Sequence, residues 1–272
     1  MITTTRTAPF GDETLATPVA VSRPPTGTAA ATALMNRVYR HQRHIYDLTR
    51  KWFLLGRTGL IADLRPSPGD AVLEIGCGTG RNLIVAARRY PDARFFGIDV
   101  STDMLTSAIE AIGRAGLVSR VRVAHADATA FHPGLVFGKQ RFERIMISYS
   151  LSMIPGWHTA LDVALSLLAK GGKLTIVDFG RQERLPAAFR AVLRAWLALF
   201  HVKPTDSLET ELASRASRDA ALASEASGQR GHSRGARAGH SPESGSSARI
   251  AKLIVERPYR GYAVYAVIEA KR

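Results

Sequence analysis

Three glycines at alternate positions form the first group of residues whose spacing indicates chemistry. The segment 72–80 reads Val-Leu-Glu-Ile-Gly-Cys-Gly-Thr-Gly, a short apolar run that leads into a glycine loop. Glycine lets the backbone turn sharply and approach a ligand closely, and a helix that follows offers free N–H groups to a carboxylate or phosphate. The dinucleotide fingerprint needs a small residue where Arg81 stands, and the Gly-Lys-Ser/Thr of a Walker A loop is missing. The loop therefore predicts a ligand site that is neither of these two.

Two acidic residues follow the loop, each after a further apolar run. Phe95-Phe96-Gly97-Ile98-Asp99 ends in an acid about twenty residues after the loop, where nucleotide-binding units hold the hydroxyls of a ribose. Ala126-Asp127-Ala128 follows the third run and supplies a second acid that can accept a hydrogen bond from an adenine amino group. Together these residues indicate an adenosine-containing ligand. The alternative is a Rossmann-like unit that binds no cofactor.

The elements that must position these residues alternate between strand and helix patterns. Apolar runs predict strands at 71–75, 94–98, 121–124, 144–147 and 173–177. Helical patterns lie between them at 81–90, at 102–115 with Ser101 or Thr102 as the cap, and at 157–169 with Gly171-Gly172 closing the helix. Segments 250–256 and 262–268 predict a closing β-hairpin. Such alternation is typical of a parallel sheet that helices cover on both faces.

The flanking segments define the expected domain limits. Residues 1–33 are rich in Thr, Pro and Ala, and we expect a disordered arm there. Amphipathic patterns predict helices at 34–57, within an N-terminal helical lid at 34–65, and at 185–201. Residues 66–213 and 249–272 are expected to form the α/β domain. The Ser/Gly/Arg-rich stretch 214–248 is expected to be a disordered insert.

Composition bounds the partners and the compartment. The 272 residues include 37 Lys and Arg against 23 Asp and Glu, a net charge of +14 that should attract nucleic acid, acidic lipid or a phosphorylated ligand. The single cysteine, Cys77, excludes an intramolecular disulfide framework and a cysteine-rich zinc site, and we predict no metal. No apolar run approaches the roughly 20 residues of a membrane span, and no secretory signal is visible. We expect a cytoplasmic protein that can act at the inner face of the membrane.

The order of these motifs resembles that of the class I S-adenosylmethionine-dependent methyltransferases. The ordered set consists of the glycine loop, the two acids, and the turn and strand at 168–174. The resemblance implies a Rossmann-like α/β fold with a mostly parallel seven-stranded sheet and a C-terminal antiparallel hairpin. It also implies S-adenosyl-L-methionine as the cofactor. In that case the cofactor's amino-acid end meets Gly76, Gly78 and Gly80, and Glu74 positions the loop. Asp99 then binds the ribose, Met104 packs on the adenine and Asp127 holds its amino group; the further cofactor-binding candidates are Cys77, Asn82, Val100, Ala128 and Ser148.

A finer resemblance lies outside the cofactor core. Segments 39–51, 148–155 and 177–180, together with the 189–202 helix, look like the bacterial betaine-lipid N-methyltransferases, which act on diacylglyceryl-homoserine. This resemblance covers about residues 35–208 and the terminal hairpin. It implies three successive methylations of one amine, a lipid substrate at an anionic membrane surface, and an aminocarboxypropyl-transferase partner that supplies the homoserine lipid.

The acceptor amine must be neutral when it attacks, and the nitrogen gains cationic character with each round, which suits aromatic faces. Tyr39, Tyr46 and Tyr149 are therefore the catalytic candidates, with His44 as a proton acceptor. Tyrosine and histidine on an amphipathic helix are also common packing or surface groups, and that alternative stays open for all four.

Other functions fit part of the sequence. Phosphatidylethanolamine or another small acceptor is the alternative substrate. An RNA-binding methyltransferase or a basic binding module that uses the Arg-rich insert is the alternative from another class. Segment 147–155 lacks the Asp/Asn-Pro-Pro-Tyr motif that amino-methyltransferases of DNA bases usually carry, which argues against nucleic acid. A cofactor-binding regulator without catalysis ranks last, and the helix at 185–201 can contact either lipid or the sheet.

Overall fold

The computed structural model describes residues 54–199, 202, 204, 207–230 and 250–271. Three of the four catalytic candidates, Tyr39, His44 and Tyr46, lie outside the described residues. The expected arm at 1–33 and most of the expected lid at 34–65 lie outside them as well. From the lid segment, the structure describes the short helix α2 (Arg57–Leu64).

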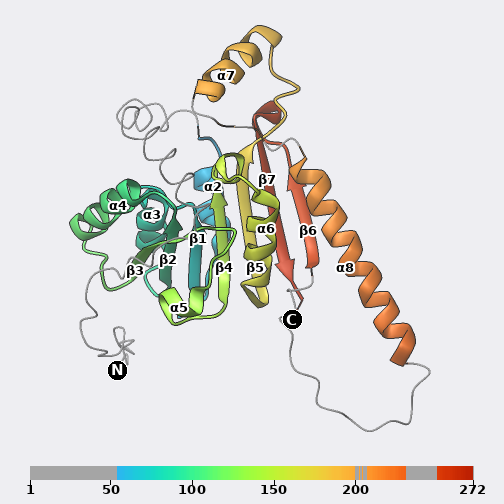
Figure 1. Cartoon of the computed structure of the whole chain (residues 1–272), viewed down its shortest axis with the longest axis horizontal. Helices are drawn as coiled ribbons and strands as arrows, with labels where there is room; N and C mark the ends of the chain where they lie inside the picture. The colour runs from blue at the N-terminus through green and yellow to red at the C-terminus, as the bar shows by residue number, and fades with distance from the viewer. Residues whose placement is uncertain (1–53, 200–201, 203, 205–206, 231–249, 272) are drawn as a thin grey trace, which may run out of the picture.

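Seven strands form one sheet in the order β3-β2-β1-β4-β5-β7-β6 (Figure 1). Strands β1 to β5 are parallel, whereas β7 pairs antiparallel with both β5 and β6. The bounds are β1 Ala71–Ile75, β2 Arg94–Asp99, β3 Val121–His125, β4 Phe142–Ser148, β5 Leu168–Phe179, β6 Ile250–Glu256 and β7 Ala263–Ala270. The expected Rossmann-like sheet with its terminal hairpin is therefore confirmed.

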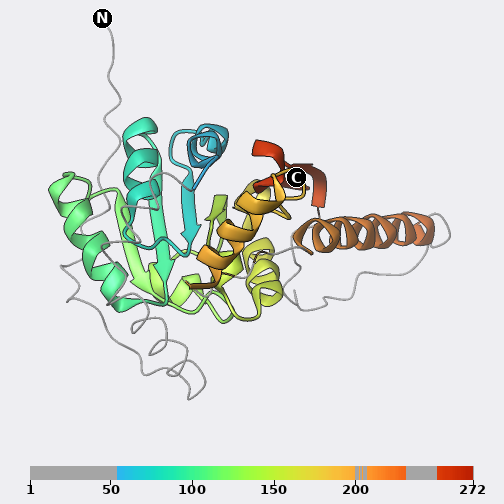
Figure 2. The ribbon, with the colours of Figure 1, turned by 90° about the horizontal axis from the view of Figure 1, so that it is seen from above.

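Helices cover both faces of the sheet (Figure 2). One apolar cluster joins the sheet to α2, α3 (Arg81–Arg89), α4 (Thr102–Arg114) and α7 (Ala187–Leu199). A second cluster, on the other face, joins it to α5 (Pro133–Phe137), α6 (Trp157–Ser166) and α8 (Leu208–Arg230). All five residues of β1 are buried because this strand lies between two neighbours and two helical layers.

The turn at Gly171-Gly172 corrects one expectation. Helix α6 ends at Ser166, and β5 begins two residues later at Leu168, so these glycines lie within the strand and do not cap the helix. Leu168 pairs with Phe142, and the register between β4 and β5 then shifts. A Cβ on Gly172 would lie 2.8 Å from the Ala169 carbonyl oxygen. The irregular start of β5 therefore requires a residue without a side chain there.

The expected disordered insert at 214–248 is wrong in its first half, because residues 214–230 belong to helix α8. Two fully buried leucines, Leu208 and Leu212, attach the helix to the second apolar cluster. Arg215 is 8% exposed; its Nε donates to Asp162 at 2.8 Å, and its guanidinium also pairs with Glu211. Alanine, a strong helix former, recurs along the segment. Residues 231–249 of the expected insert lie outside the described residues.

None of the described helices is long and apolar enough to cross a bilayer. Within the described residues, no group of three or more His, Cys, Asp or Glu side chains has the arrangement of a metal site.

Candidate active site

The glycine loop turns through three left-handed residues at the carboxyl end of β1. Gly76, Gly78 and Gly80 have φ values of 72°, 52° and 72°, a region that L side chains rarely adopt. A Cβ on Gly76 would lie only 2.4 Å from the Cβ of Ser150. The first glycine is therefore required twice, by its backbone conformation and by the close approach of the segment after β4.

Glu74 and Asn82 fasten the two sides of this loop together. The Asn82 side-chain amide on α3 donates to Glu74 Oε1 on β1 at 2.8 Å, and both side chains are buried. Helix α3 begins after Gly80 with no side chain capping its first turn. The first N–H groups of a helix have no partner within the helix, so they are available to an anion at the loop.

The side chain of Cys77, a predicted cofactor-binding residue, is buried and does not line the glycine loop. Its side chain is 4% exposed, and a Cβ on Gly97 of β2 would lie 2.9 Å from its Sγ. The side chain therefore packs between the loop and β2. Only the backbone of Cys77 is left to meet a ligand at the loop.

Asp99 ends β2 and holds two backbone groups. Its Oδ2 accepts from the Gly78 N–H at 2.7 Å, and its Oδ1 accepts from the Ser101 N–H at 2.9 Å. The residue is half-buried, as is Val100 beside it. Ser101 then caps α4 by accepting from the Met104 N–H at 3.3 Å, as the sequence predicts.

The third group of predicted cofactor residues lies beyond β3. The Ala126 N–H donates to the Asp99 carbonyl at 3.1 Å, so the segment that carries Asp127 and Ala128 is attached to the end of β2. Asp127 is half-buried, and its Oδ1 accepts from both the N–H and the hydroxyl of Thr129. Met104 is 3% exposed in the first turn of α4. The structure therefore gathers the ends of β1, β2 and β3 at one edge.

These residues fit S-adenosylmethionine. The uncapped start of α3 and the glycine loop suit the carboxylate and close backbone contacts of its amino-acid end. The half-buried Asp99 and Asp127 keep carboxylates at the two neighbouring strand ends, where a ribose and an adenine would need acceptors. When bound, the cofactor supplies an electrophilic methyl group on a sulfonium.

The segment after β4 lies beside the glycine loop. The hydroxyl of Ser150 donates to the Ile75 carbonyl at 2.9 Å, and the Tyr149 N–H donates to the Val177 carbonyl at 2.7 Å. Tyr149 has a φ of 55°, a conformation that costs a bulky side chain about 1–3 kcal/mol. Ser148, another predicted cofactor residue, is 2% exposed.

The side chain of Tyr149 is buried among aromatic rings. Its ring centroid lies 4.7 Å from that of Phe179, and the Phe179 centroid lies 5.9 Å from that of Tyr262, both in edge-to-face geometry. The Tyr149 hydroxyl donates to the Leu55 carbonyl at 2.6 Å. Burial raises the pKa of this hydroxyl well above its ordinary value. Tyr149 is therefore a neutral ring held in place, not a proton acceptor.

Asp178 and Gln182 are buried polar residues of this region that were absent from the predicted site. The Asp178 carboxylate accepts from the N–H groups of Ser152, at 3.1 Å, and Phe179, at 2.7 Å. Desolvation by complete burial raises its pKa from 3.8 to about 6. Gln182 is also fully buried and has a φ of 61°; its side-chain amide makes no hydrogen bond within the described residues. The sequence signals for Asp178 are a lone acid in an apolar strand and its place in segment 177–180, one of the segments that carry the finer resemblance.

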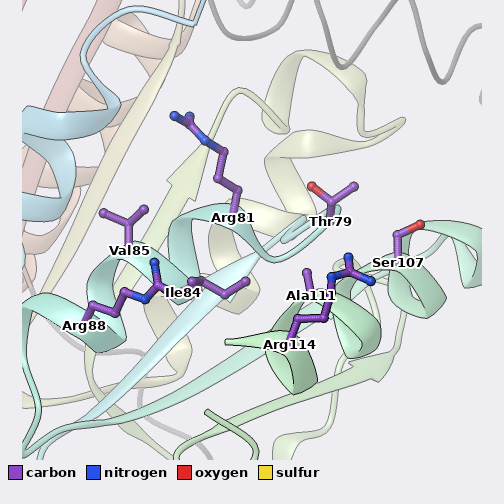
Figure 3. A pocket seen from close by; sticks show the side chains of 8 residues that line it. All are labelled: Thr79, Arg81, Ile84, Val85, Arg88, Ser107, Ala111 and Arg114. Atoms are coloured by element: carbon purple, nitrogen blue, oxygen red, sulfur yellow. The ribbon is translucent and has the colours of Figure 1, made fainter. Parts of the chain in front are cut away.

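A cavity of about 420 Å³ opens between α3 and α4, next to the glycine loop. Its lining includes three arginines and no acidic residue: Arg81 and Arg88 come from α3 and Arg114 from α4 (Figure 3). Arg114 also pairs with the exposed Glu110 at 3.6 Å. The surface that leads to the loop is therefore positively charged.

Comparisons with known proteins agree with this geometry. Residues 72–172 match a family model described as "Methyltransferase domain". Demethylmenaquinone methyltransferase of Bacteroides fragilis is 24% identical over 139 residues, which cover 51% of this chain and 54% of that protein. The ubiquinone/menaquinone biosynthesis C-methyltransferase UbiE of Allorhizobium ampelinum is 28% identical over 160 residues, covering 55% of this chain and 60% of that protein. The chain thus spans little more than half the length of these relatives.

Among solved structures, the YcgJ protein of Bacillus subtilis has the same fold. The two chains superpose with a TM-score of 0.52 at 16% identity, over 80% of this chain and 98% of that one. The glycine loop, the strand order and the matched segment together define a class I S-adenosylmethionine-dependent methyltransferase domain, whose methyl donor is S-adenosylmethionine.

Proposed function

We propose that this protein is an N-methyltransferase that trimethylates the amine of diacylglyceryl-homoserine and so forms the betaine lipid diacylglyceryl-trimethylhomoserine. The observation that carries the proposal is Tyr149, a strained, buried aromatic residue directly after β4. Backbone strain of this kind persists where surrounding structure enforces it, often at functional sites. Here the Val177 carbonyl and the neighbouring Ser150 hold the segment against the glycine loop.

The chemistry of the acceptor supports an aromatic environment. Methyl transfer from a sulfonium is an in-line displacement, so the protein mainly aligns the amine with the methyl group. The buried rings of Tyr149, Phe179 and Tyr262 pack edge-to-face on one another in the segment beside the loop, and aromatic rings favour a nearby nitrogen that becomes cationic.

Two other acceptors remain as outcomes of the test. Phosphatidylethanolamine offers the same primary amine on a lipid. RNA would use the basic surface, including the arginines of residues 231–249. Removing 231–249 is the sharper deletion for the RNA alternative, because a deletion from residue 214 would also remove the buried Arg215 that anchors α8.

The experiment supplies purified full-length protein with radiolabelled S-adenosylmethionine. Vesicles that contain diacylglyceryl-homoserine, vesicles that contain phosphatidylethanolamine, and bulk RNA are offered in parallel. We expect label in mono-, di- and trimethylated homoserine lipid and background label in the other two acceptors. Label in phosphatidylethanolamine or RNA alone would contradict the proposed acceptor, and no transfer to any acceptor would contradict it as well.

Matched variants separate methyl transfer from general damage. Asp99→Ala removes a carboxylate that organises the loop and should abolish labelling of every acceptor. Asp92→Ala removes an exposed carboxylate seven residues earlier, between α3 and β2, and should leave labelling unchanged.

A further inference from the structure

The peptide unit that joins Val100 to Ser101 is held by a side chain at each end. Its N–H, which belongs to Ser101, donates to Asp99 Oδ1 at 2.9 Å. Its carbonyl, which belongs to Val100, lies 3.1 Å from Nε2 of His125. A carbonyl oxygen can only accept, so Nε2 carries a proton and donates it to this bond. The peptide unit therefore connects the His125 side chain to the Asp99 carboxylate.

The register of the sheet brings His125 to this peptide unit. His125 is the last residue of β3 and pairs with Asp99, the last residue of β2. The Ala126 N–H donates to the Asp99 carbonyl at 3.1 Å, so the two strand ends are fixed side by side. The half-buried imidazole then adds a bond one residue beyond the last strand pair, to Val100.

These hydrogen bonds form a continuous series from the glycine loop to β3. Asp99 Oδ2 accepts from the Gly78 N–H at 2.7 Å, and Oδ1 accepts from the peptide unit that His125 holds. Hydrogen bonds in series polarise one another, so donation to the Val100 carbonyl makes the Ser101 N–H a stronger donor to the carboxylate. Without the imidazole, one of the two N–H groups that orient Asp99 would be held less firmly.

The orientation of Asp99 matters for the ligand. Nucleotide-binding units hold the ribose hydroxyls on an acid at this place, directly after the second strand. Each carboxylate oxygen of Asp99 already accepts one backbone N–H, so these two donors set the direction of the lone pairs that remain. A rotated carboxylate would turn those lone pairs away from a pair of hydroxyls.

We propose that His125 is a positioning residue of the cofactor site. Through the peptide unit between Val100 and Ser101, it orients the Asp99 carboxylate toward the ribose hydroxyls of S-adenosylmethionine. His125 was absent from the predicted site, because its partner is a backbone carbonyl 25 residues away. This role concerns the cofactor alone, so it is independent of the proposed lipid acceptor.

The test measures binding of S-adenosylhomocysteine to the full-length protein by titration calorimetry, with no methyl acceptor present. We expect His125→Ala to lower the affinity about tenfold, which is the effect of weakening one hydrogen bond to a charged group. For the 2′,3′-dideoxy analogue, which lacks both ribose hydroxyls, the same substitution should change the affinity less than about twofold. An equal loss with both ligands would overturn the proposal, as would no loss with either.

Two conservative variants test the donor atom itself. His125→Gln places an amide nitrogen close to where Nε2 lies, whereas His125→Asn places it close to the Nδ1 position, out of reach of the Val100 carbonyl. His125→Gln should therefore keep the affinity for S-adenosylhomocysteine within about twofold, and His125→Asn should lose as much as His125→Ala. Equal affinities of the two variants, or the opposite order, would overturn the proposal.

His132→Ala is the matched control. His132 is exposed and directly precedes α5, which Figure 1 shows at the amino ends of the strands, and its side chain does not cap that helix. This variant should bind both ligands as the unmodified protein does. Melting temperatures without ligand complete the comparison: a destabilised His125→Ala that loses both ligands equally would assign His125 to general stability and overturn the proposal. If His125→Ala does not fold, the Gln and Asn variants carry the same test with the two ligands.

Discussion

Asp99 is the last residue of β2 and Asp178 the last but one of β5, both at the carboxyl ends of parallel strands, and each accepts hydrogen bonds from two backbone N–H groups. They differ in their surroundings: Asp99 is half-buried, whereas Asp178 has no exposed surface and its pKa is raised to about 6. A partly exposed carboxylate can still accept from a ligand, but a fully buried one can only position its neighbours. This end of the sheet therefore has two parts. One is built from glycines and backbone groups, and we call it the cofactor half. The other is built from buried polar and aromatic side chains, and we call it the acceptor half because the proposed function assigns the acceptor to it.

The largest effect is expected from Gly76→Ala in the cofactor half. The added Cβ would meet Ser150 at 2.4 Å in a left-handed backbone, so we expect a loss of about 3 kcal/mol in stability and at least about 100-fold in cofactor affinity. Isothermal titration and thermal unfolding measure the two effects. Gly116→Ala is the control, with a φ of 69° and no atom within 4 Å of the new Cβ, and should cost about 1 kcal/mol only. Equal losses of stability in Gly76→Ala and Gly116→Ala would show that Gly76 and Ser150 are not in close contact.

In the acceptor half, Asp178 should make the free energy of unfolding depend on pH. Because the folded-state pKa of Asp178 lies above the ordinary 3.8, its contribution to stability is complete below about pH 4 and is lost as pH rises through about 6. The loss amounts to about 3 kcal/mol, at about 1.4 kcal/mol per pH unit. Urea unfolding of the unmodified protein and Asp178→Asn from pH 4 to 8 gives the difference, in which other titrating groups cancel. A difference that does not vary with pH would mean that Asp178 and Asp99 do not differ as described.

Asp99→Asn should destabilise the protein less than Gly76→Ala does, and less than the change in pH does at Asp178. The amide keeps one acceptor for the backbone but loses charge, so we expect cofactor affinity to fall about tenfold and stability to fall by about 1 kcal/mol. Titration calorimetry against the exposed-site control Asp92→Asn measures the difference. Unchanged affinity would remove Asp99 from the cofactor half.

The smallest effect is expected from Tyr149→Phe. It removes only the hydrogen bond to the Leu55 carbonyl, which should cost about 1 kcal/mol in stability and leave methyl transfer within about threefold. Tyr149→Ala, which also removes the ring, should abolish transfer. If Tyr149→Phe alone lowered the rate by about 100-fold at an unchanged melting temperature, the hydroxyl would be a proton-transfer group after all.

The cofactor half could be predicted from sequence because its determinants are local. Glycine spacing, the acid at the end of β2 and the Ser101 cap each depend on neighbours within a few residues, and all have the expected places. The acceptor half depends on contacts between distant segments, such as Ser152 with Asp178 and Tyr149 with Leu55, which no pattern along the chain records. For the same reason the sequence did not predict α8. Most of its residues are polar or small, and it is attached to the sheet by two buried leucines and the buried Arg215, whose partners are distant in sequence.

Helix α2 crosses from one edge of the sheet to the other. At the carboxyl end of the helix, the Leu64 carbonyl accepts from Arg144, near the amino end of β4. Just before the helix begins, the Leu55 carbonyl accepts from Tyr149, at the carboxyl end of β4. The described part of the chain therefore begins beside Tyr149 of the candidate site. Leu55 therefore attaches the preceding part of the chain to the molecule at the carboxyl ends of the strands, the same end of the sheet that carries the glycine loop.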